Sequence, residues 1–393
     1  MLEYDMAIVG GGPIGGFIAK KIAEKNIKVA IFERNKEIGV PINCAGLISE
    51  RVFDILNISS KNIIQNKIKG ANIHSPSGNI LKIGGEKVHA LVIDRNNFDK
   101  EIIRKATEKG AELFLKSNVV AVQKTGDFIE LKTSQNHDIR CRLLVGADGP
   151  FSKIRDRFAF PKPDEFLRGI GAEVSNVSID PDFVEIFVGN KIAPGFFAWV
   201  IPTNKDGTSA RAGLCINQNS LYPPKYYFSN FLKNKHWTVL KNAEINRYIG
   251  GIVPLGPLKS TFSSNVFIVG DAAAQVKPTS GGGIYTGLLC AKHCSNVSIE
   301  AFGKNNFSSK FLKRYHKLWT ADIGKELSLG MKFRKVYKRL TDKQFDKYIN
   351  RFQNPKVIEA ISKYGDIDYP SKLIKPLLKK TPSLIKLLPN FIK

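Results

Sequence analysis

Acidic residues are scarce in this sequence of 393 residues, which has 35 Asp and Glu against 60 Lys and Arg and a formal net charge of +25 at pH 7. The imbalance is greatest near the C-terminus, because residues 301–393 hold 22 Lys and Arg but only 7 Asp and Glu. Such a basic segment attracts polyanions, namely nucleic acid, an anionic membrane or a phosphorylated substrate. A solvated lysine-rich surface would give the same composition.

Cysteine and histidine are also too few, or too far apart, for several kinds of site. The five cysteines form an odd set without a Cys-x-x-Cys pair, which argues against a disulfide framework and favours a reducing compartment. The six histidines show no His-x-His or His-x-x-x-His pair, so we expect no metal site. There is no apolar run of eighteen residues and no basic N-terminal segment ahead of a long apolar one. We therefore expect no membrane span, no signal peptide and a cytoplasmic location.

The pattern along the chain predicts an α/β protein (α+β overall) with two domains and a helical extension. The chain starts as strand, glycine turn, helix and strand, becomes rich in strands, and is helical after the 270s. We expect a discontinuous Rossmann-type domain of residues 1–70, 94–164 and 256–305. A β-rich substrate domain of residues 71–93 and 165–255 is inserted into it, and a basic helical region of residues 306–393 follows.

The first glycine turn is typical of dinucleotide binding. "VGGGPIGG" places Gly10, Gly12 and Gly15 in a Gly-x-Gly-x-x-Gly pattern around Ile14, after a strand and before a helix. Such glycines permit a tight turn, close approach to a pyrophosphate and close packing of helix on strand. Glu33 ends the second strand, where its carboxylate can accept hydrogen bonds from both ribose hydroxyls.

Two later loops extend the site beyond a pyrophosphate. Asp148 follows a buried strand in "LLVGADG", and Asp271 opens "GDAAAQVKPTSGGGIYTG" at 270–287. We expect Asp271 to bind ribityl hydroxyls. The glycine triplet would bring a helix N-terminus, at Gly282, Gly283 and Ile284, against a flavin ring. The predicted cofactor is FAD.

This pair of late aspartate loops resembles the aromatic-hydroxylase-like superfamily of FAD proteins. The resemblance implies that Arg95, at the start of a helix, lies between pyrophosphate and flavin. It also implies that the backbone of Val119 meets the adenine.

A closer resemblance covers the chain from Met1 to about residue 360. "GVPINCAGLIS" at 39–49, "PGFFAWVIP" at 194–202 and the 270–287 stretch resemble the geranylgeranyl reductase family, in particular archaeal digeranylgeranylglycerophospholipid reductases. This implies FAD-dependent saturation of isolated double bonds in geranylgeranyl chains of archaeal-type membrane lipid precursors. Hydride would come from N5 of reduced FAD, together with a proton.

The resemblance also assigns residues around the ring. The family's Tyr-x-Trp-x-Phe-Pro pattern falls on four substrate-binding candidates, of which two depart by one hydroxyl and one ring: Phe197, Trp199, Ile201 and Pro202. Phe197 and Trp199 are also catalytic candidates, since their faces would stabilise a tertiary cation if protonation came first. Cys44 corresponds to a cysteine beside the flavin and is either catalytic or a small side chain packed under the ring. A turn of small residues follows it beside the ring: Ala45, Gly46 and Leu47.

The partners expected from the sequence are a lipid, an electron donor and a membrane surface. A second Gly-x-Gly-x-x-Gly is absent, so electrons would come from a docked ferredoxin or a transiently bound reduced nicotinamide or deazaflavin. Residues 371–393 have six lysines and no acids, and we expect them to lie on the anionic inner face of the cell membrane or to pack over the active site. No nucleic-acid motif is present, so we expect no nucleic-acid partner.

Two alternative functions remain open at this point. A flavin-dependent monooxygenase acting on an isoprenoid or aromatic substrate shares all three FAD stretches. A basic flavoprotein without catalysis, binding nucleic acid or membrane, is supported by charge alone.

Overall fold

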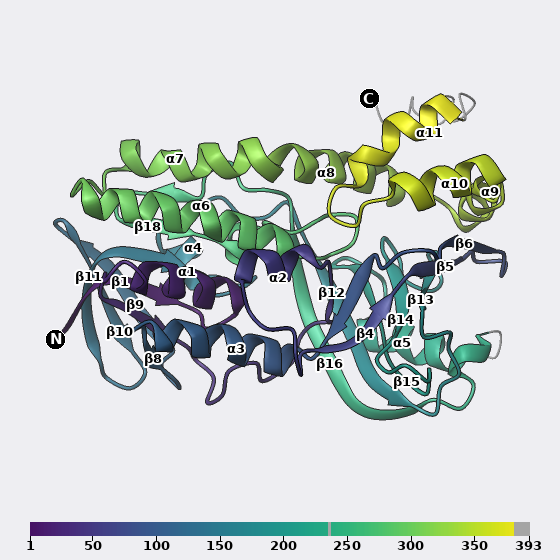
Figure 1. Cartoon of the computed structure of the whole chain (residues 1–393), viewed down its shortest axis with the longest axis horizontal. Coiled ribbons are helices and arrows are strands. Elements are labelled where there is room, and N and C mark those ends of the chain that lie inside the picture. Colours follow the sequence, from purple (N-terminus) through teal and green to yellow (C-terminus); the bar gives the residue numbers. More distant parts are fainter. Residues whose placement is uncertain (235–236, 381–393) are drawn as a thin grey trace.

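The computed structural model describes residues 1–234 and 237–380 (Figure 1). Two large sheets lie at opposite ends of the long axis, and α6, α7 and α8 run across one side (Figure 1). A three-stranded sheet of β3 (Leu47–Ile48), β7 (Ala90–Ile93) and β4 (Ile64–Ile68) accompanies them.

The first large sheet is a Rossmann-type sheet of eight strands. Its order is β17-β18-β11-β1-β2-β8, and the pairs from β18 to β8 are all parallel. A hairpin of β9 and β10 extends it from β11 in antiparallel fashion. The strands are β1 (Leu2–Val9), β2 (Val29–Phe32), β8 (Glu112–Phe114), β9 (Val119–Thr125), β10 (Phe128–Thr133), β11 (Asp138–Gly146), β17 (Phe262–Ser263) and β18 (Val266–Ile268).

The second large sheet has seven strands in the order β16-β12-β15-β14-β13-β5-β6. All neighbours are antiparallel except β13 and β5, which run parallel. The strands are β5 (Gly70–His74), β6 (Ile80–Gly84), β12 (Glu165–Ser175), β13 (Phe183–Val188), β14 (Phe197–Pro202), β15 (Ser209–Asn217) and β16 (Glu244–Leu255). Because successive side chains of a strand point to opposite faces, each strand of this sheet contributes residues to both of its faces.

Helices cover both sheets. They are α1 (Pro13–Ala23), α2 (Arg51–Leu56), α3 (Arg95–Glu108), α4 (Lys153–Arg157), α5 (Pro224–Leu232), α6 (Ile284–Gly303), α7 (Ser309–Trp319), α8 (Lys325–Tyr337), α9 (Asp342–Phe352), α10 (Pro355–Tyr364) and α11 (Ile374–Lys380). Short turns complete the list: the 3-10 turns η1 (Thr238–Leu240), η2 (Gly270–Ala273) and η4 (Pro370–Leu373), and the π-helical turn η3 (Thr320–Gly324).

Apolar cores hold each sheet to its helices. Met6 and Ile8 of β1 share a buried cluster with Phe17 of α1 and Leu288 of α6. On the second sheet, Phe228 of α5 belongs to a cluster with inward residues of β14 and β15. The other side of the sheet has its own buried cluster, in which Ala7 of β1 and Ala30 of β2 meet Val122 and Leu131 of the β9–β10 hairpin.

The predicted fold class is confirmed, whereas the domain limits stay a prediction. Strands β5 and β6 join the second sheet as placed from the sequence, but β7 pairs with β3 and β4. Helix α5 lies within residues 165–255, a range that we predict to be β-rich. The local reason is a Pro-Pro start, which sets the first helical turn, followed by apolar residues spaced for one face.

Most of the lysine-rich tail lies outside the described residues, since only residues 371–380 of 371–393 are placed, in η4 and α11. Among residues 1–234 and 237–380, none of the helices combines the length and the apolar character needed to span a bilayer.

Candidate functional site

The glycines of the first turn are enforced by contacts. Gly10 has a φ of +110°, and a Cβ there would lie 2.2 Å from the carbonyl oxygen of Ala147. A Cβ on Gly15 would lie 2.0 Å from the carbonyl oxygen of Gly10. Gly12, which caps α1, meets nothing within 4 Å. The turn therefore exposes bare backbone and the positive end of α1 to an anionic group.

Glu33 holds this turn from the end of β2. Its carboxylate accepts hydrogen bonds from the backbone N–H groups of Gly11, at 2.8 Å, and Asn35, at 2.8 Å. These bonds fix the carboxylate beside the turn, at the carboxyl end of a parallel strand, where ligands of such sheets bind.

A cavity of about 140 Å³ opens beside the turn. The residues that line it include five of the predicted cofactor contacts: Gly10, Gly12, Glu33, Val119 and Asp148. Oδ2 of Asp148 accepts a hydrogen bond from the backbone of Ile154 at 3.2 Å, whereas Oδ1 is buried and has no partner among the described residues. Burial raises the pKa of Asp148, and a hydrogen bond from Ser152 opposes the rise. An unpaired buried acceptor is costly, so the place favours a ligand with donor groups.

The loop that starts at Cys44 leads toward the second sheet. The Cys44 sulfur accepts a hydrogen bond from the N–H of Gly46 at 3.3 Å. Arg95, the first residue of α3, contacts the same sulfur and pairs with Asp99 at 2.9 Å. Burial disfavours the charge of Arg95, yet Asp99 and the Cys44 sulfur hold its pKa above the usual value. A fixed positive charge therefore lies beside Cys44.

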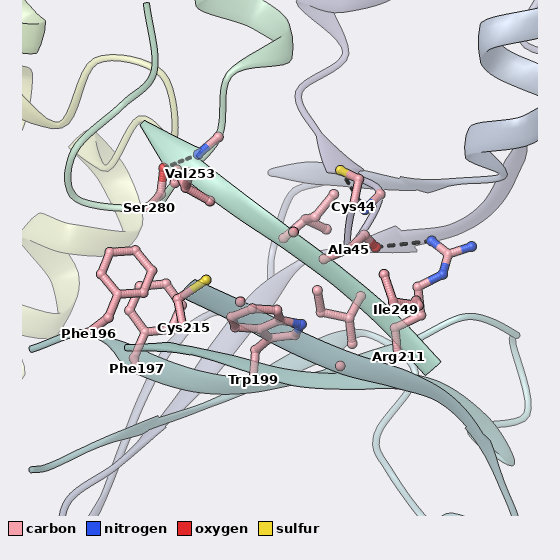
Figure 2. Close-up of a pocket in the computed structure, with 18 of the residues that line it drawn as sticks. Cys44, Ala45, Phe196, Phe197, Trp199, Arg211, Cys215, Ile249, Val253 and Ser280 are labelled. Carbon is pink, nitrogen blue, oxygen red and sulfur yellow. Dashed lines mark hydrogen bonds between the residues drawn. The ribbon is translucent and has the colours of Figure 1, made fainter. Parts of the chain in front are cut away.

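A buried arginine of β15 clamps this loop. Nη1 of Arg211 donates to the carbonyl oxygen of Ala45 at 3.0 Å (Figure 2). It also donates to the carbonyl oxygen of Ile93 at 2.9 Å. Gly46 has a φ of +71°, and a Cβ there would lie 2.3 Å from the same Nη1. Burial lowers the pKa of Arg211, and Glu173 opposes the shift. The clamp therefore holds the loop in one place against the second sheet.

The loop between β18 and α6 packs against the first turn. A Cβ on Gly270 would lie 3.0 Å from Ile14, and one on Gly287 would lie 2.7 Å from it. Burial raises the pKa of Asp271 to about 6, and the charge of Arg95 opposes the rise. A Cβ on Gly283 would lie 2.9 Å from Oδ1 of Asp271, so glycine lets α6 start directly beside this carboxylate.

An apolar cavity of about 280 Å³ lies between the Cys44 loop and the second sheet. Phe197 and Trp199 of β14 rise from the sheet on one side, with Cys44 and Ala45 on the other (Figure 2). The Phe197 and Trp199 rings meet edge to face, with centroids 6.1 Å apart and planes at 72°. A Cβ on Gly213 would lie 2.7 Å from the Trp199 ring, so this glycine makes room for the indole.

The predicted residues divide between these places. The apolar cavity is lined by Cys44, Ala45, Gly46, Leu47, Phe197, Trp199, Ile201 and Gly282. Pro202 follows Ile201 on the opposite face of β14 and is not among the described lining residues; its carbonyl accepts a hydrogen bond from Asn66 at 3.3 Å. The other predicted residues line neither cavity and lie in α1, α3, η2 or at the start of α6: Ile14, Gly15, Arg95, Asp271, Gly283 and Ile284. Their roles toward a ligand stay predictions.

Many residues that line the apolar cavity were not predicted from the sequence, and three of them matter most for its structure. Arg211 is one, and its only local signal is a lone charge in the apolar run of β15. Lys277 is another, with Nζ donating to the carbonyl oxygen of Ile367 at 2.9 Å and to Oδ1 of Asp368 at 2.8 Å. Asp368 also pairs with Arg51 at 3.0 Å. Ile367 is the third, so the C-terminal region supplies part of the wall.

The observed features fit FAD. The glycine turn and the unpaired Asp148 oxygen suit the dinucleotide half, and the cavity beside Cys44 and Gly282 suits a ring. Groups of three or more metal-ligating side chains are absent from the described part of the chain.

Comparison with known proteins agrees with this geometry. The family model of the FAD binding domain matches residues 3–297. An uncharacterized protein of Methanocaldococcus jannaschii is 34% identical over 380 residues, covering 96% of this chain and 95% of its own. A protein of Methanothermobacter thermautotrophicus named digeranylgeranylglycerophospholipid reductase 2 is 29% identical over 391 residues, covering 95% of this chain and 98% of its own.

Solved structures show the same fold. A geranylgeranyl bacteriochlorophyll reductase-like protein of Thermoplasma acidophilum has a TM-score of 0.87 and 25% sequence identity, and each chain covers 100% of the other. A flavin-dependent brominase has a TM-score of 0.72 at 16% identity, with 97% of this chain and 100% of that chain covered, a likeness of fold alone.

Proposed function

The chain belongs to the FAD binding domain family, and from this premise we propose that it is an FAD-dependent reductase that saturates isolated double bonds of geranylgeranyl chains in membrane lipid precursors. Relatives that align with nearly the whole chain bear the name of that activity. The observation that supports the proposal best is the apolar cavity between the Cys44 loop and the aromatic residues of β14.

The lining of the cavity matches an alkene better than a polar substrate. The side chains that face it from β14 are apolar, and its two cations, Arg211 and Lys277, are already paired with protein groups. An isolated double bond offers no carbonyl for a charged residue to polarise. Shape and an apolar surface are therefore what this chain provides for recognition.

In the proposed reaction the alkene gains a hydride on one carbon and a proton on the other. Reduced FAD supplies the hydride when it is bound. Trp199 and Phe197 lie across the cavity from the Cys44 loop, where their faces stabilise positive charge that develops on the substituted carbon. The Arg211 clamp keeps the Cys44 loop at a fixed distance from these rings. Closure by Ile367 excludes water from the apolar space.

The electron donor belongs to the same proposal. The chain carries one Gly-x-Gly-x-x-Gly fingerprint and an excess of basic residues, which suits an acidic one-electron carrier such as ferredoxin. Anaerobic reduction kinetics with ferredoxin and with NADPH separate a carrier from a nicotinamide, and faster reduction by NADPH would contradict this part.

The reaction itself is tested by mass spectrometry of lipids. The purified flavoprotein, reduced without oxygen, is mixed with an unsaturated digeranylgeranyl lipid, and we expect mass gains in steps of two hydrogens. The heat-inactivated protein is the control. A product that appears only with O₂ and gains an oxygen atom would overturn the reductase in favour of a monooxygenase.

A further inference from the structure

An exposed group of large side chains lies at one end of the second sheet. We name it the aromatic lip and define it as Leu221, Tyr222, Tyr226 and Tyr248. Leu221 is 83% exposed and Tyr248 is 58% exposed. The Tyr222 and Tyr226 rings contact each other with centroids 4.2 Å apart. Tyrosine combines an apolar ring with a polar tip, a combination that favours the boundary between water and lipid.

The aromatic lip borders a path into the apolar cavity. An outer hollow of about 440 Å³ is lined by Pro223, Lys225 and Tyr248 together with residues of β12 and β16. Four of its lining residues also line the inner apolar cavity: Gly169, Ile170, Ile249 and Gly250. The two spaces therefore share a wall, and that wall lies at the edge strand β16.

Several residues of this shared wall are glycines and contribute no side chain. Gly169 of β12 pairs with Gly251 of β16, and the neighbouring pair is Ile170 with Gly250. Gly250 is exposed, and a Cβ there would lie 3.7 Å from the carbonyl oxygen of Gly169, so sterics inside the sheet do not require glycine. The shared wall therefore carries no side chain at Gly250, on the exposed edge strand.

The charge around the lip is positive. The described residues of 221–248 include Lys225, Lys233, Lys241 and Arg247 against one acidic residue, Glu244, and Arg247 pairs with Glu173 at 2.9 Å. Lys225 is exposed beside the lip and lines the outer hollow. Apolar rings next to lysines complement a bilayer whose surface is anionic.

We propose that the aromatic lip docks on an anionic lipid bilayer and that the isoprenoid chain of the substrate enters the apolar cavity past Gly250. This inference rests on the proposed function, since it takes the inner cavity as the prenyl site. It places the membrane against the α5 end of the second sheet.

Vesicle flotation tests the docking surface. Wild type is expected to bind phosphatidylglycerol vesicles more strongly than phosphatidylcholine vesicles, and the double variant Leu221→Asp/Tyr222→Ser is expected to bind the former at least roughly tenfold more weakly. Val120→Asp is the matched control, because Val120 is 55% exposed on β9 of the other sheet. FAD absorbance confirms that each variant is folded, and the assay needs no turnover, so its failure is separate from failure of the reductase.

Three results would overturn docking at the lip. One is equal vesicle binding by wild type and the lip variant. A second is an equal loss in Val120→Asp. The third is a loss of binding on removal of residues 381–393 that the lip variant does not show. If the lip variant instead dissociates a dimer in sedimentation velocity, with vesicle binding unchanged, the lip is an interface between copies and the proposal fails.

Entry past Gly250 has its own test. Gly250→Trp is expected to retain vesicle binding and FAD but to lower kcat/KM for the lipid at least roughly tenfold, and Gly250→Ala is expected to lose much less. Equal kcat/KM for the two variants would overturn this route. Failure of wild type to reduce the lipid would instead count against the proposed function and leave the vesicle result standing.

Discussion

The two cavities of this molecule lie close together but depend on different properties of the chain. The cavity beside the first turn is shaped by backbone, since a Cβ on Gly10 or Gly15 would lie within 2.2 Å of a carbonyl oxygen. The cavity beside β14 is shaped by side chains from loops, strands and the C-terminal region. Trp199 contributes an aromatic ring to its wall, whereas Arg211 holds the Cys44 loop in place by a hydrogen bond to the carbonyl oxygen of Ala45. The first tolerates almost no change, while the second can change its selectivity one side chain at a time.

The largest expected effect breaks the backbone-built cavity. We expect Gly15→Val to bind FAD at least roughly tenfold more weakly, because a side chain at this position would overlap the carbonyl oxygen of Gly10. The ratio of flavin to protein absorbance measures this. Gly303→Val is the control, since a Cβ at Gly303 meets nothing within 4 Å. Full flavin content in Gly15→Val would show that the turn is not closed as described.

The next largest effect is expected from removing the Arg211 clamp, which holds the Cys44 loop against the second sheet. Arg211→Met leaves the carbonyl oxygens of Ala45 and Ile93 without their donor, and we expect a loss of roughly 3 kcal/mol of unfolding free energy. Urea denaturation of the flavoprotein measures it. Arg247→Met is a matched control, because Arg247 pairs with the same Glu173 at 2.9 Å but is half exposed, and should cost about 1 kcal/mol or less. Equal losses would contradict the clamp.

A smaller effect is expected from replacing the aromatic ring of Trp199 in the cavity beside β14. Trp199→Leu is expected to lower kcat roughly thirtyfold, which corresponds to a loss of about 2 kcal/mol of transition-state stabilisation. The variant is expected to retain FAD. Trp199→Phe preserves an aromatic face and should lose much less. Should the leucine and phenylalanine variants have the same kcat, the aromatic face would have no part in the reaction.

The smallest expected effect is a pH dependence of the FAD-free protein. Burial raises the pKa of Asp271 to about 6, so the protonated carboxyl is favoured by folding below its unfolded pKa near 4, and this stabilisation is lost as pH rises through about 6. Asp271→Asn should therefore match wild type at pH 4 and melt roughly 2 °C higher at pH 8. Thermal unfolding at both pH values measures this, and a variant that is less stable at pH 8 would refute it.

The difference between the cavities also explains what the sequence reveals. The fold class, the resemblance to digeranylgeranylglycerophospholipid reductases and the FAD cofactor were predicted and are confirmed, because glycine spacing and aspartate loops are local signals. Arg211 and Lys277 were missed, since the carbonyl oxygens and the carboxylate to which they donate hydrogen bonds lie 90 or more positions away in the chain. The face of Pro202 could have been found from strand alternation, which places it opposite Phe197 and Trp199.

Helix α5 is a helical element within a range that the sequence predicts only as β-rich. Its residues are rich in aromatic side chains, which favour strands, but a Pro-Pro start and packing of Phe228 against the second sheet select a helix. Tertiary packing, which no window of sequence contains, decides the outcome. The exposed ring of Tyr226 on the same helix was likewise invisible before the sheet edge was known.

The wall that Ile367 adds to the inner cavity has a consequence for biosynthesis. The ribosome makes this residue after both large sheets, so a nascent chain can complete the glycine turn and the β14 strand while the cavity still lacks one side. Translation therefore supplies this part of the wall last, after the strands that carry the glycine turn and the aromatic rings. The pairing of Asp368 with Lys277 and Arg51 then joins the last part of the chain to its first quarter.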